Sequence, residues 1–410
     1  MPESEGELRI SVISSIGQIP VKNATVTISY TGDPSRILRT LTTNESGQTD
    51  LIDLPAPDVN YSLTPESVVQ PYSEYNIEVT AEGYEPALVS GTEILAGVTA
   101  LQPIELIPLE SPEQSETVVI PAHTLFYEYP PKIPEDEIKP MDESGEIVLS
   151  RVVIPEYIIV HDGVPSDSTA PNYYVRYRDY IKNVASCEIY ATWPEAAIYA
   201  NNLVIMSFTL NRVYTEWYRN QGYDFTITTS TAYDQKYMHG RNIYSNIDYL
   251  VDTIFANFLS RPGVRQPIFT SYCDGKRVIC DGLSQWGSKY LADEGYSAIE
   301  IIHYYYGSDM YINTAVAISG VPSSWPGYNL TIGASGDKVR QAQMQLNRIA
   351  QNYPAIPTIT ADGIYGPRTA EAVRIFQGIF NLPQTGIIDY ATWYELSEIF
   401  VGVSRIAEPQ

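Results

Sequence analysis

The alternation of apolar and polar residues over the first hundred residues constrains the fold most. Segments such as L-R-I-S-V-I, A-T-V-T-I-S-Y and Y-N-I-E-V-T-A have the period of two that is expected of half-buried strands, and clusters of turn-forming residues separate them. No segment with helical periodicity intervenes between residues 6 and 107. Regularly spaced short strands of this kind predict an all-β sandwich over residues 1–107.

The pattern changes three more times along the chain. Residues 108–150 are rich in proline and acidic residues, which is typical of an extended linker, and the apolar patch from His123 to Tyr129 predicts that part of the linker straps onto a neighbouring domain. Residues 151–325 mix strand-like and helix-like segments, which predicts an α+β domain. Residues 326–410 contain three amphipathic segments joined by Gly/Asp turns, which predicts a three-helix bundle. The expected fold class is therefore multidomain.

Charge excludes one class of partner. The net charge is −24 over 410 residues, and nucleic acid is not expected as a partner because phosphate binding needs clustered basic side chains. We also expect no membrane span, since no apolar run reaches the length of a bilayer-crossing helix. The acidic first residues lack the apolar core of a secretory signal. The export route stays open among a removed signal, cell lysis, a spore compartment and a phage-tail-like particle.

The three cysteines do not form a disulfide framework. Cys273 and Cys280 flank Asp274-Gly275, a dipeptide that predicts a two-residue hairpin turn. In that register the two sulfur atoms lie about 13 Å apart along the ladder, four residues at the strand rise. We therefore expect no bridge between them, although Cys187 and Cys280 can approach in space.

Glu188 occupies an unusual position for a carboxylate. Residues Tyr173–Tyr190 have helical periodicity, and Tyr177, Ile181 and Val184 lie on one apolar stripe. Glu188 follows four residues after Val184 on that stripe. It is either a solvated residue at the helix end or a carboxyl held against a hydrophobic wall. In the second case its pKa rises and it can donate a proton near neutral pH.

Glu195 has a plainer expected role. The sequence Thr192-Trp193-Pro194-Glu195 matches a capping box, with Thr192 as N-cap and Glu195 three residues later. The pattern therefore predicts that Glu195 caps the following helix.

Two motifs in the middle of the chain resemble one family. The run S-C-E-I-Y-A-T-W-P-E-A-A around Glu188 and the run G-L-S-Q-W-G at Gly282–Gly287 are similar, in the same order, to motifs of the stage II sporulation protein D family of peptidoglycan lytic transglycosylases. The resemblance covers roughly residues 150–312. It implies that Glu188 is the acid that protonates the glycosidic oxygen and then, as a carboxylate, takes the proton of the muramyl C6 hydroxyl. A single carboxyl of raised pKa suffices for this reaction.

The same resemblance implies binding residues. Gln235, Ser284 and Gln285 would bind sugar hydroxyls, while Tyr237 and Trp286 would offer apolar faces to pyranose rings; for the aromatic residues, core packing is the alternative. The family's usual Lys and Arg are replaced by Tyr199 and Met206, its usual His by Ile279, and its zinc motif by Tyr233-Asp234-Gln235. We therefore expect no metal and no cofactor; the alternative is a new metal site from Cys187, Cys273 or Cys280 with His239.

The last segment resembles a second family. The runs G-A-S-G-D-K-V-R-Q-A-Q-M-Q-L, D-G-I-Y-G-P-R-T-A-E-A-V-R-I-F-Q and T-G-I-I-D-Y-A-T-W-Y-E-L are similar to the signature of the peptidoglycan-binding three-helix domain. The resemblance implies ligand contacts near Asp362, Tyr365 and Thr369. The expected core of this domain consists of Val339, Leu346, Val373, Phe376, Trp393 and Leu396.

Together these features predict a modular peptidoglycan-remodelling protein. Its central domain would be a lytic transglycosylase that cleaves MurNAc–GlcNAc β-1,4 bonds, and its C-terminal module would retain it on the wall. Residues 6–107 resemble carboxypeptidase-regulatory-like, transthyretin-like domains, which act as spacers or as docking platforms for other envelope or particle proteins. The alternative is a non-catalytic wall-binding or structural protein with an inactive central domain. Either protein would lie in the cell envelope, outside the cell or on the spore.

Overall fold

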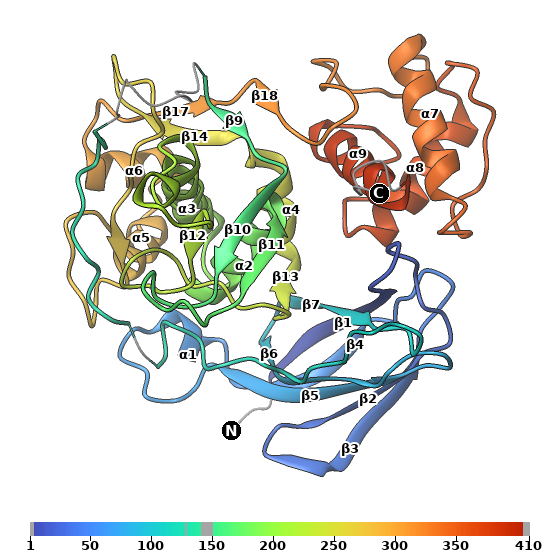
Figure 1. Ribbon diagram of the computed structural model, residues 1–410, viewed down its shortest axis with the longest axis horizontal. Coiled ribbons are helices and arrows are strands. Elements are labelled where there is room, and N and C mark those ends of the chain that lie inside the picture. The colour runs from blue at the N-terminus through green and yellow to red at the C-terminus, as the bar shows by residue number, and fades with distance from the viewer. Residues whose placement is uncertain (1–3, 128, 141–150, 405–410) are drawn as a thin grey trace.

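The computed structural model describes residues 4–127, 129–140 and 151–404, which form a β-rich N-terminal region, a central region of mixed α and β structure, and a helical C-terminal region (Figure 1). Residues 141–150 of the expected linker and 405–410 at the chain end lie outside the described residues. No helix of the described residues is long and apolar enough to cross a membrane.

Two sheets build the β-rich region. In the first, the strand order is β13-β7-β1-β4; β1 runs parallel to β7 and antiparallel to β4. These strands are β1 (Ser4–Ser14), β4 (Ile52–Ala56), β7 (Thr99–Leu106) and β13 (Ile243–Tyr244). Since β13 belongs to the central part of the sequence, a central segment extends the N-terminal sheet, which the strand pattern did not predict.

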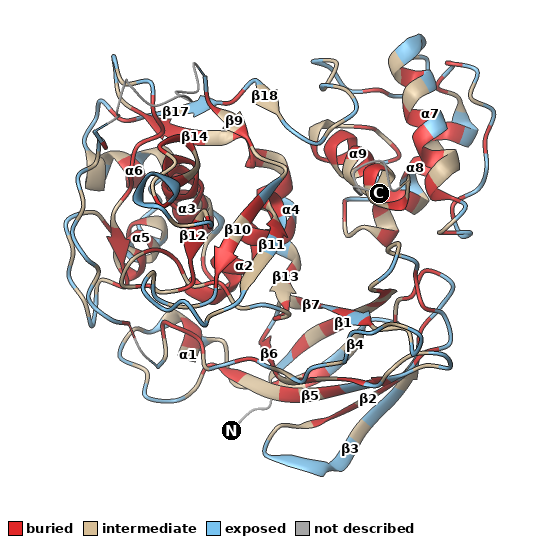
Figure 2. Cartoon of the chain, in the orientation of Figure 1, coloured by how far each residue is buried: buried red, intermediate tan, exposed pale blue. Residues whose placement is uncertain are grey.

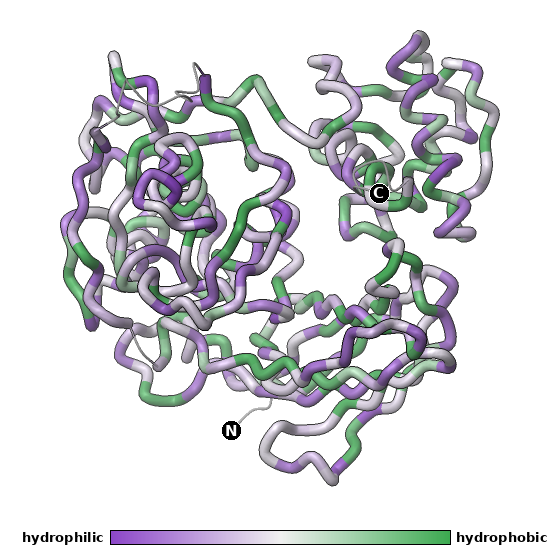
Figure 3. The backbone as a smooth tube through the Cα atoms, in the orientation of Figure 1, coloured by the Kyte–Doolittle hydropathy of each residue, from purple (hydrophilic) through white to green (hydrophobic). Residues whose placement is uncertain are grey.

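The second sheet has the order β3-β2-β5-β6-β8. Its strands are β2 (Thr25–Tyr30), β3 (Asp33–Thr42), β5 (Tyr72–Thr80), β6 (Ala87–Leu95) and β8 (Val118–Val119), and the short helix α1 (Asn60–Leu63) lies between β4 and β5 in sequence. Apolar residues alternate with polar ones along β2 and β5, where Val26, Ile28 and Ile77 are buried; Figure 3 shows the hydropathy along the chain. The edge strand β3 is largely exposed (Figure 2).

The central region is arranged around helix α3 (Glu195–Tyr214), which is apolar on nearly all sides and therefore buried. The other helices are α2 (Tyr177–Glu188), α4 (Ser245–Ile254), α5 (Gln285–Asp293) and α6 (Ala298–Tyr306), with a 3₁₀ turn η1 (Arg219–Gln221). The strands are short: β9 (Val153–Ile154), β10 (Tyr157–His161), β11 (Asn172–Arg176), β12 (Ile227–Thr228), β14 (Asn257–Ser260), β15 (Tyr272–Cys273), β16 (Leu283–Ser284), β17 (Tyr311–Thr314) and β18 (Ala317–Ile318).

The C-terminal region contains helices α7 (Asp337–Ile349), α8 (Pro367–Ile379) and α9 (Tyr390–Ser404). The six residues expected to form its core are at most 1% exposed, which confirms that prediction: Val339, Leu346, Val373, Phe376, Trp393 and Leu396. This region is tied to the central one by charge. Arg178 on α2 forms ion pairs with Asp252 on α4 and with Glu395 and Glu398 on α9.

The predicted cap of α3 is wrong. Its N-cap is Pro194, and no side chain caps the helix. Thr192 instead hydrogen-bonds Ser62 of the β-rich region (Oγ1–Oγ 2.8 Å). The Thr192 hydroxyl, which the local motif predicted to cap the helix, therefore bonds a residue that is distant in the sequence.

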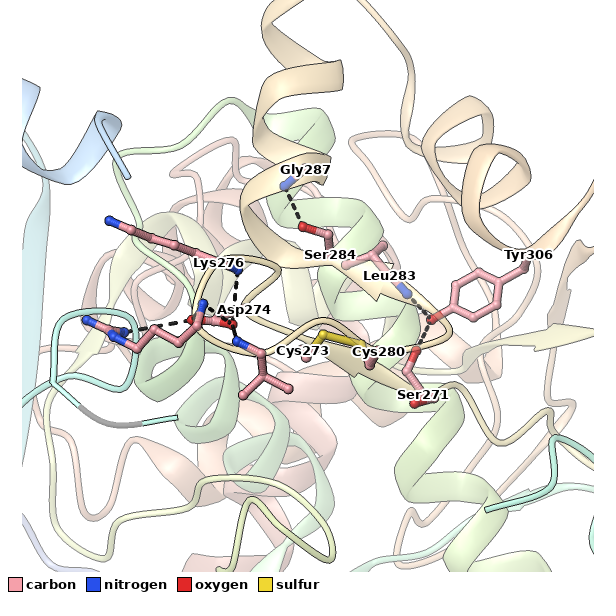
Figure 4. The surroundings of a disulfide bond; sticks show 11 residues. Ser271, Cys273, Asp274, Lys276, Cys280, Leu283, Ser284, Gly287 and Tyr306 are labelled. Carbon is pink, nitrogen blue, oxygen red and sulfur yellow. Dashed lines mark hydrogen bonds and ion pairs between the residues drawn. A yellow bond between two sulfur atoms is a disulfide. The ribbon is translucent and has the colours of Figure 1, made fainter. Parts of the chain in front are cut away.

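The expectation of unpaired cysteines is also wrong, because Cys273 and Cys280 form a disulfide with their Cα atoms 6.1 Å apart (Figure 4). The intervening residues form no hairpin. The Asp274 carboxylate accepts N–H bonds from Lys276, Arg277 and Val278, which folds the loop back on itself. β15 then pairs in parallel with β16 beyond the loop. The ladder register assumed for Asp274-Gly275 therefore does not exist, and the predicted separation does not apply.

Candidate functional site

Glu188 is the last residue of α2, yet its side chain is fully buried. The helix end lies inside the central region, so the alternative of a solvated residue at the helix end is wrong, and the carboxyl is buried as the other alternative expected. Both carboxyl oxygens have partners. The backbone N–H of Lys236 donates to Oε1 (2.7 Å), and the Tyr272 hydroxyl donates to Oε2 (2.6 Å).

Burial raises the pKa of Glu188 because the charged form loses its hydration. The positive charge of Lys132 and the two hydrogen bonds oppose this shift without cancelling it. Burial and the charge of Glu188 in turn raise the pKa of Tyr272, so its hydroxyl stays protonated and donates. The arrangement is that of a carboxylic acid kept reluctant to ionise, which suits a general acid.

Part of what surrounds Glu188 comes from the linker rather than from the central region. Tyr129 is buried with its hydroxyl unpaired, and burial together with the Glu188 charge raises its pKa. The ammonium of Lys132 lies 4.4 Å from the ring centroid of Tyr272 and donates to the backbone oxygen of Asp234 (2.6 Å). We call residues 129–139 the strap. The strap thus supplies two of the groups that surround the candidate acid.

The strap runs along the outer side of the central region, where Figure 1 shows it as part of the teal trace that leads towards β9. Just before it, His123 is buried and stacks on Tyr190 at 4.5 Å, and Thr124 donates to the carbonyl of Cys187. The described residues of the expected apolar patch therefore dock on the central region, and His123 is a packing residue there.

The other residues expected to bind sugar are mostly buried in this conformation. Gln235 is fully buried; its amide oxygen accepts from Tyr180 (3.1 Å) and Thr209 (2.8 Å), which makes it part of the packing around α3. Tyr237 is 4% exposed and stacks on Tyr180, with its hydroxyl 3.0 Å from Nδ1 of His239. The sugar-binding roles of Gln235 and Tyr237 stay predictions.

The Gly282–Gly287 motif forms the start of α5. Ser284 is the N-cap and accepts from the N–H of Gly287 (2.9 Å; Figure 4). Gln285 is fully buried, and its side-chain oxygen and nitrogen have no hydrogen-bond partner. Trp286 packs against Trp193 with ring centroids 4.9 Å apart. The motif therefore lies close to Trp193, and of its three predicted binding residues only Ser284 is partly exposed.

Two of the cavities in the described residues lie elsewhere. One lies at the contact of the central and C-terminal regions and is lined by residues that include Arg176, Tyr177 and Glu398. The other lies where all three regions meet, lined by Arg9, Ser245, Gln384 and others. Neither contains Glu188, Gln235 or Gln285. Over the described ranges, no group of three or more His, Cys, Asp or Glu side chains is placed to hold a metal ion.

Tyr272, Lys132 and Arg212 are the functional candidates that sequence reasoning missed. Tyr272 lies in a two-residue strand and Lys132 in a proline-rich segment. No local spacing relates either residue to Glu188, since only the path of the chain brings them together. Arg212 lies in the last turn of α3 and forms ion pairs with Asp234 and Glu135.

In the C-terminal region, Gln343 joins the residues expected to contact the wall. Its amide nitrogen donates to Oδ1 of Asp362 and to Oγ1 of Thr369, both at 3.1 Å, and its oxygen accepts from Gly363 (2.8 Å). Asp362 is exposed, whereas Thr369 is 3% exposed. Tyr365 is 1% exposed and donates to the carbonyl of Gly386, so it points inward. Of the three, only Asp362 offers its side chain to a ligand in this conformation.

Comparison with known proteins identifies one family. Residues 335–396 match the family model described as a putative peptidoglycan binding domain. This match associates the chain with peptidoglycan and hence with the cell wall. A search of the curated proteins found no match.

Several solved structures are similar to parts of the chain. The Bacillus anthracis TIE protein is 18% identical over 26% of this chain and 17% of its own, with a TM-score of 0.19. The minor pilin GBS52 of Streptococcus agalactiae is 15% identical over 28% of this chain and 49% of its own, also with a TM-score of 0.19. The chain thus spans less than half the length of either protein. TM-scores this low support no conclusion about fold or function.

Proposed function

We propose that this protein is a peptidoglycan-binding protein whose central region is catalytically closed in the described conformation. One observation carries the proposal of closure: the Glu188 side chain has no exposed surface, and both its oxygens are hydrogen-bonded inside the protein. A proton donor must approach the glycosidic oxygen within hydrogen-bond distance. The match at residues 335–396 supports wall binding, and the β-rich region serves as a spacer or docking platform in this proposal.

A lytic transglycosylase is the second candidate, favoured by the environment of Glu188. In this reaction the Glu188 carboxyl proton passes to the glycosidic oxygen, and the C1–O4 bond breaks. The carboxylate then takes the proton of the muramyl C6 hydroxyl as the O6–C1 bond forms, so that no water is consumed. The raised pKa of Glu188 suits the first step, and the resemblance of its motif to the stage II sporulation protein D family supports the assignment. The reaction requires Glu188 to be uncovered.

One experiment separates the two functions. The full chain and its Glu188→Gln variant are incubated with purified sacculi, and both pelleting and soluble 1,6-anhydro-muropeptides are measured. Pelleting of both chains without anhydro products supports the closed wall-binding protein. Anhydro products from the wild type and not from the variant establish the enzyme. Failure of both chains to pellet contradicts wall binding.

A further inference from the structure

The strap contacts the central region as a bound polymer would. It carries prolines at three of its positions and has no helix or strand, so it lies as an extended chain. The N–H of Ile133 donates to the carbonyl of Ala232 (2.8 Å), and the carbonyl of Glu137 accepts from Phe269 (3.0 Å). At its end, the Gln266 amide bonds both the N–H and the carbonyl of Lys139. Backbone groups of the strap are thus recognised along its length.

Cationic groups of the central region face the acidic side chains of the strap. Arg212 donates two bonds to Glu135 (2.8 and 2.6 Å), and Arg261 pairs with Glu137 through two bonds. Residues two apart on an extended chain point to the same side, roughly 6.5 Å apart, so the two carboxylates meet the two guanidinium groups together. Arginine recognises carboxylates in this bidentate manner.

Aromatic rings of the central region lie beside Arg212 and beneath the lysines of the strap. The Arg212 guanidinium lies 4.8 Å from the ring centroid of Phe269 and 5.1 Å from that of Trp217. The ammonium of Lys139, from the strap, lies over the same two rings at 3.7 and 4.9 Å, and that of Lys132 lies over Tyr272. Aromatic faces flanked by guanidinium groups are the features expected of a site for sugar rings that carry carboxylates. The strap covers all of these features at once, and Glu188 lies beneath it.

We infer that the strap fills a groove in which the central region binds an extended, carboxylate-bearing glycan, with Glu135 and Glu137 in the places of the ligand's carboxylates. This inference rests on the proposed function, because peptidoglycan strands with stem peptides are the ligand of this class at the wall. Arg212 and Arg261 supply the two cations of this groove, and the carboxylates of the strap now occupy them.

The strap competes with a soluble glycan for the groove, and it is favoured because it belongs to the same chain. A tethered segment has a high effective concentration, and a ligand binds the open form with an affinity reduced by the fraction of open molecules. Soluble glycan fragments are therefore expected to bind the intact chain weakly and a chain with a loosened strap more tightly.

The test uses the full chain with Glu188→Gln to prevent turnover, with and without the double substitution Glu135→Gln/Glu137→Gln. The probe is a soluble muramidase digest of sacculi with intact stem peptides, and affinity is measured by calorimetry. We expect the loosened strap to lower the Kd at least tenfold. Asp293→Asn removes the exposed carboxylate of an ion pair with Lys289 on α5 and is the matched control, which should leave the Kd unchanged. The C-terminal module is identical in all the chains, so the difference reports the groove.

Amide hydrogen exchange at Ile133 shows whether the strap has been released. If exchange does not rise, the strap is replaced by a Gly/Ser segment of equal length and the titration is repeated. If the strap is released and the Kd for the soluble fragments does not change, the inference that the strap fills a glycan-binding groove is wrong. Tighter binding that Arg261→Ala removes supports it. Pelleting with sacculi is measured in parallel. If the chains pellet and the Kd is unchanged, the groove hypothesis is rejected and the wall-binding proposal stands. If only pelleting is lost, the wall-binding proposal is rejected.

Discussion

The guanidinium of Arg212 binds the carboxylate of Glu135 through two hydrogen bonds, Nη1–Oε2 at 2.8 Å and Nη2–Oε1 at 2.6 Å. Its third bond, from Nε, goes to Asp234 at 2.7 Å. The Arg212 side chain is fully buried and that of Glu135 is 12% exposed. This pair ties the linker to the central helix α3.

Replacement of Glu135 by Gln is expected to loosen the strap. The neutral amide loses the charge-assisted bonds to Arg212, which is worth about 1–3 kcal/mol, while Asp234 continues to neutralise the guanidinium. Exchange of the Ile133 and Phe269 amide hydrogens, which bond across the strap contact, should accelerate about tenfold or more. Unchanged exchange at both amides would show that the pair does not hold the strap.

Replacement of Glu188 by Gln is expected to reduce the pH dependence of stability. The folded pKa of Glu188 lies above its ordinary value of 4.5. The folded state therefore holds a proton that the unfolded state has released, and stability falls as pH rises above 4.5 towards the folded pKa. The fall is about 1.4 kcal/mol for each pH unit over which the states differ by one full proton. Urea unfolding between pH 4 and pH 8 checks the slope. A variant with the wild-type slope would contradict the assignment.

Replacement of Gln343 by Ala is expected to disorder the loop that presents Asp362. The change removes three donor contacts and leaves the buried N–H of Gly363 unpaired, at a cost of about 2–3 kcal/mol. Thermal unfolding and sacculus pelleting should both weaken. Gln351→Ala, at an exposed position after α7, is the control. Weakened pelleting in the control alone would place the contact surface elsewhere.

Replacement of Cys280 by Ser is expected to lower the free energy of unfolding by about 2–3 kcal/mol, because the closed loop of Cys273–Cys280 restricts the unfolded chain. Reduction of the wild type should produce the same loss. Since Cys187 is free and buried, Cys187→Ser distinguishes loss of the bridge from loss of a thiol. Equal stability with and without a reductant would show that the bridge does not contribute.

The sequence predicted those features that depend on neighbours along the chain. Strand alternation predicted the β-rich N-terminal region, and helical spacing predicted the core residues Val339, Leu346 and Phe376, because these patterns arise within one element. Predictions that relied on a local motif alone were less secure. The hydroxyl of Thr192 forms a hydrogen bond with Ser62 of another region and does not cap α3. The Asp274 carboxylate accepts backbone N–H bonds that fold a loop where a hairpin was expected.

The sequence by itself determined that Glu188 lies on an apolar stripe near the end of a helix, since helical period fixes which residues share a face. The tertiary structure decided which groups contact that carboxyl. Tyr272 arrives from a distant strand and Lys132 from the linker, and no spacing in the sequence encodes either contact. The burial that raises the pKa of Glu188 and the covering by the strap both come from how distant segments pack, because desolvation depends on everything that surrounds a group.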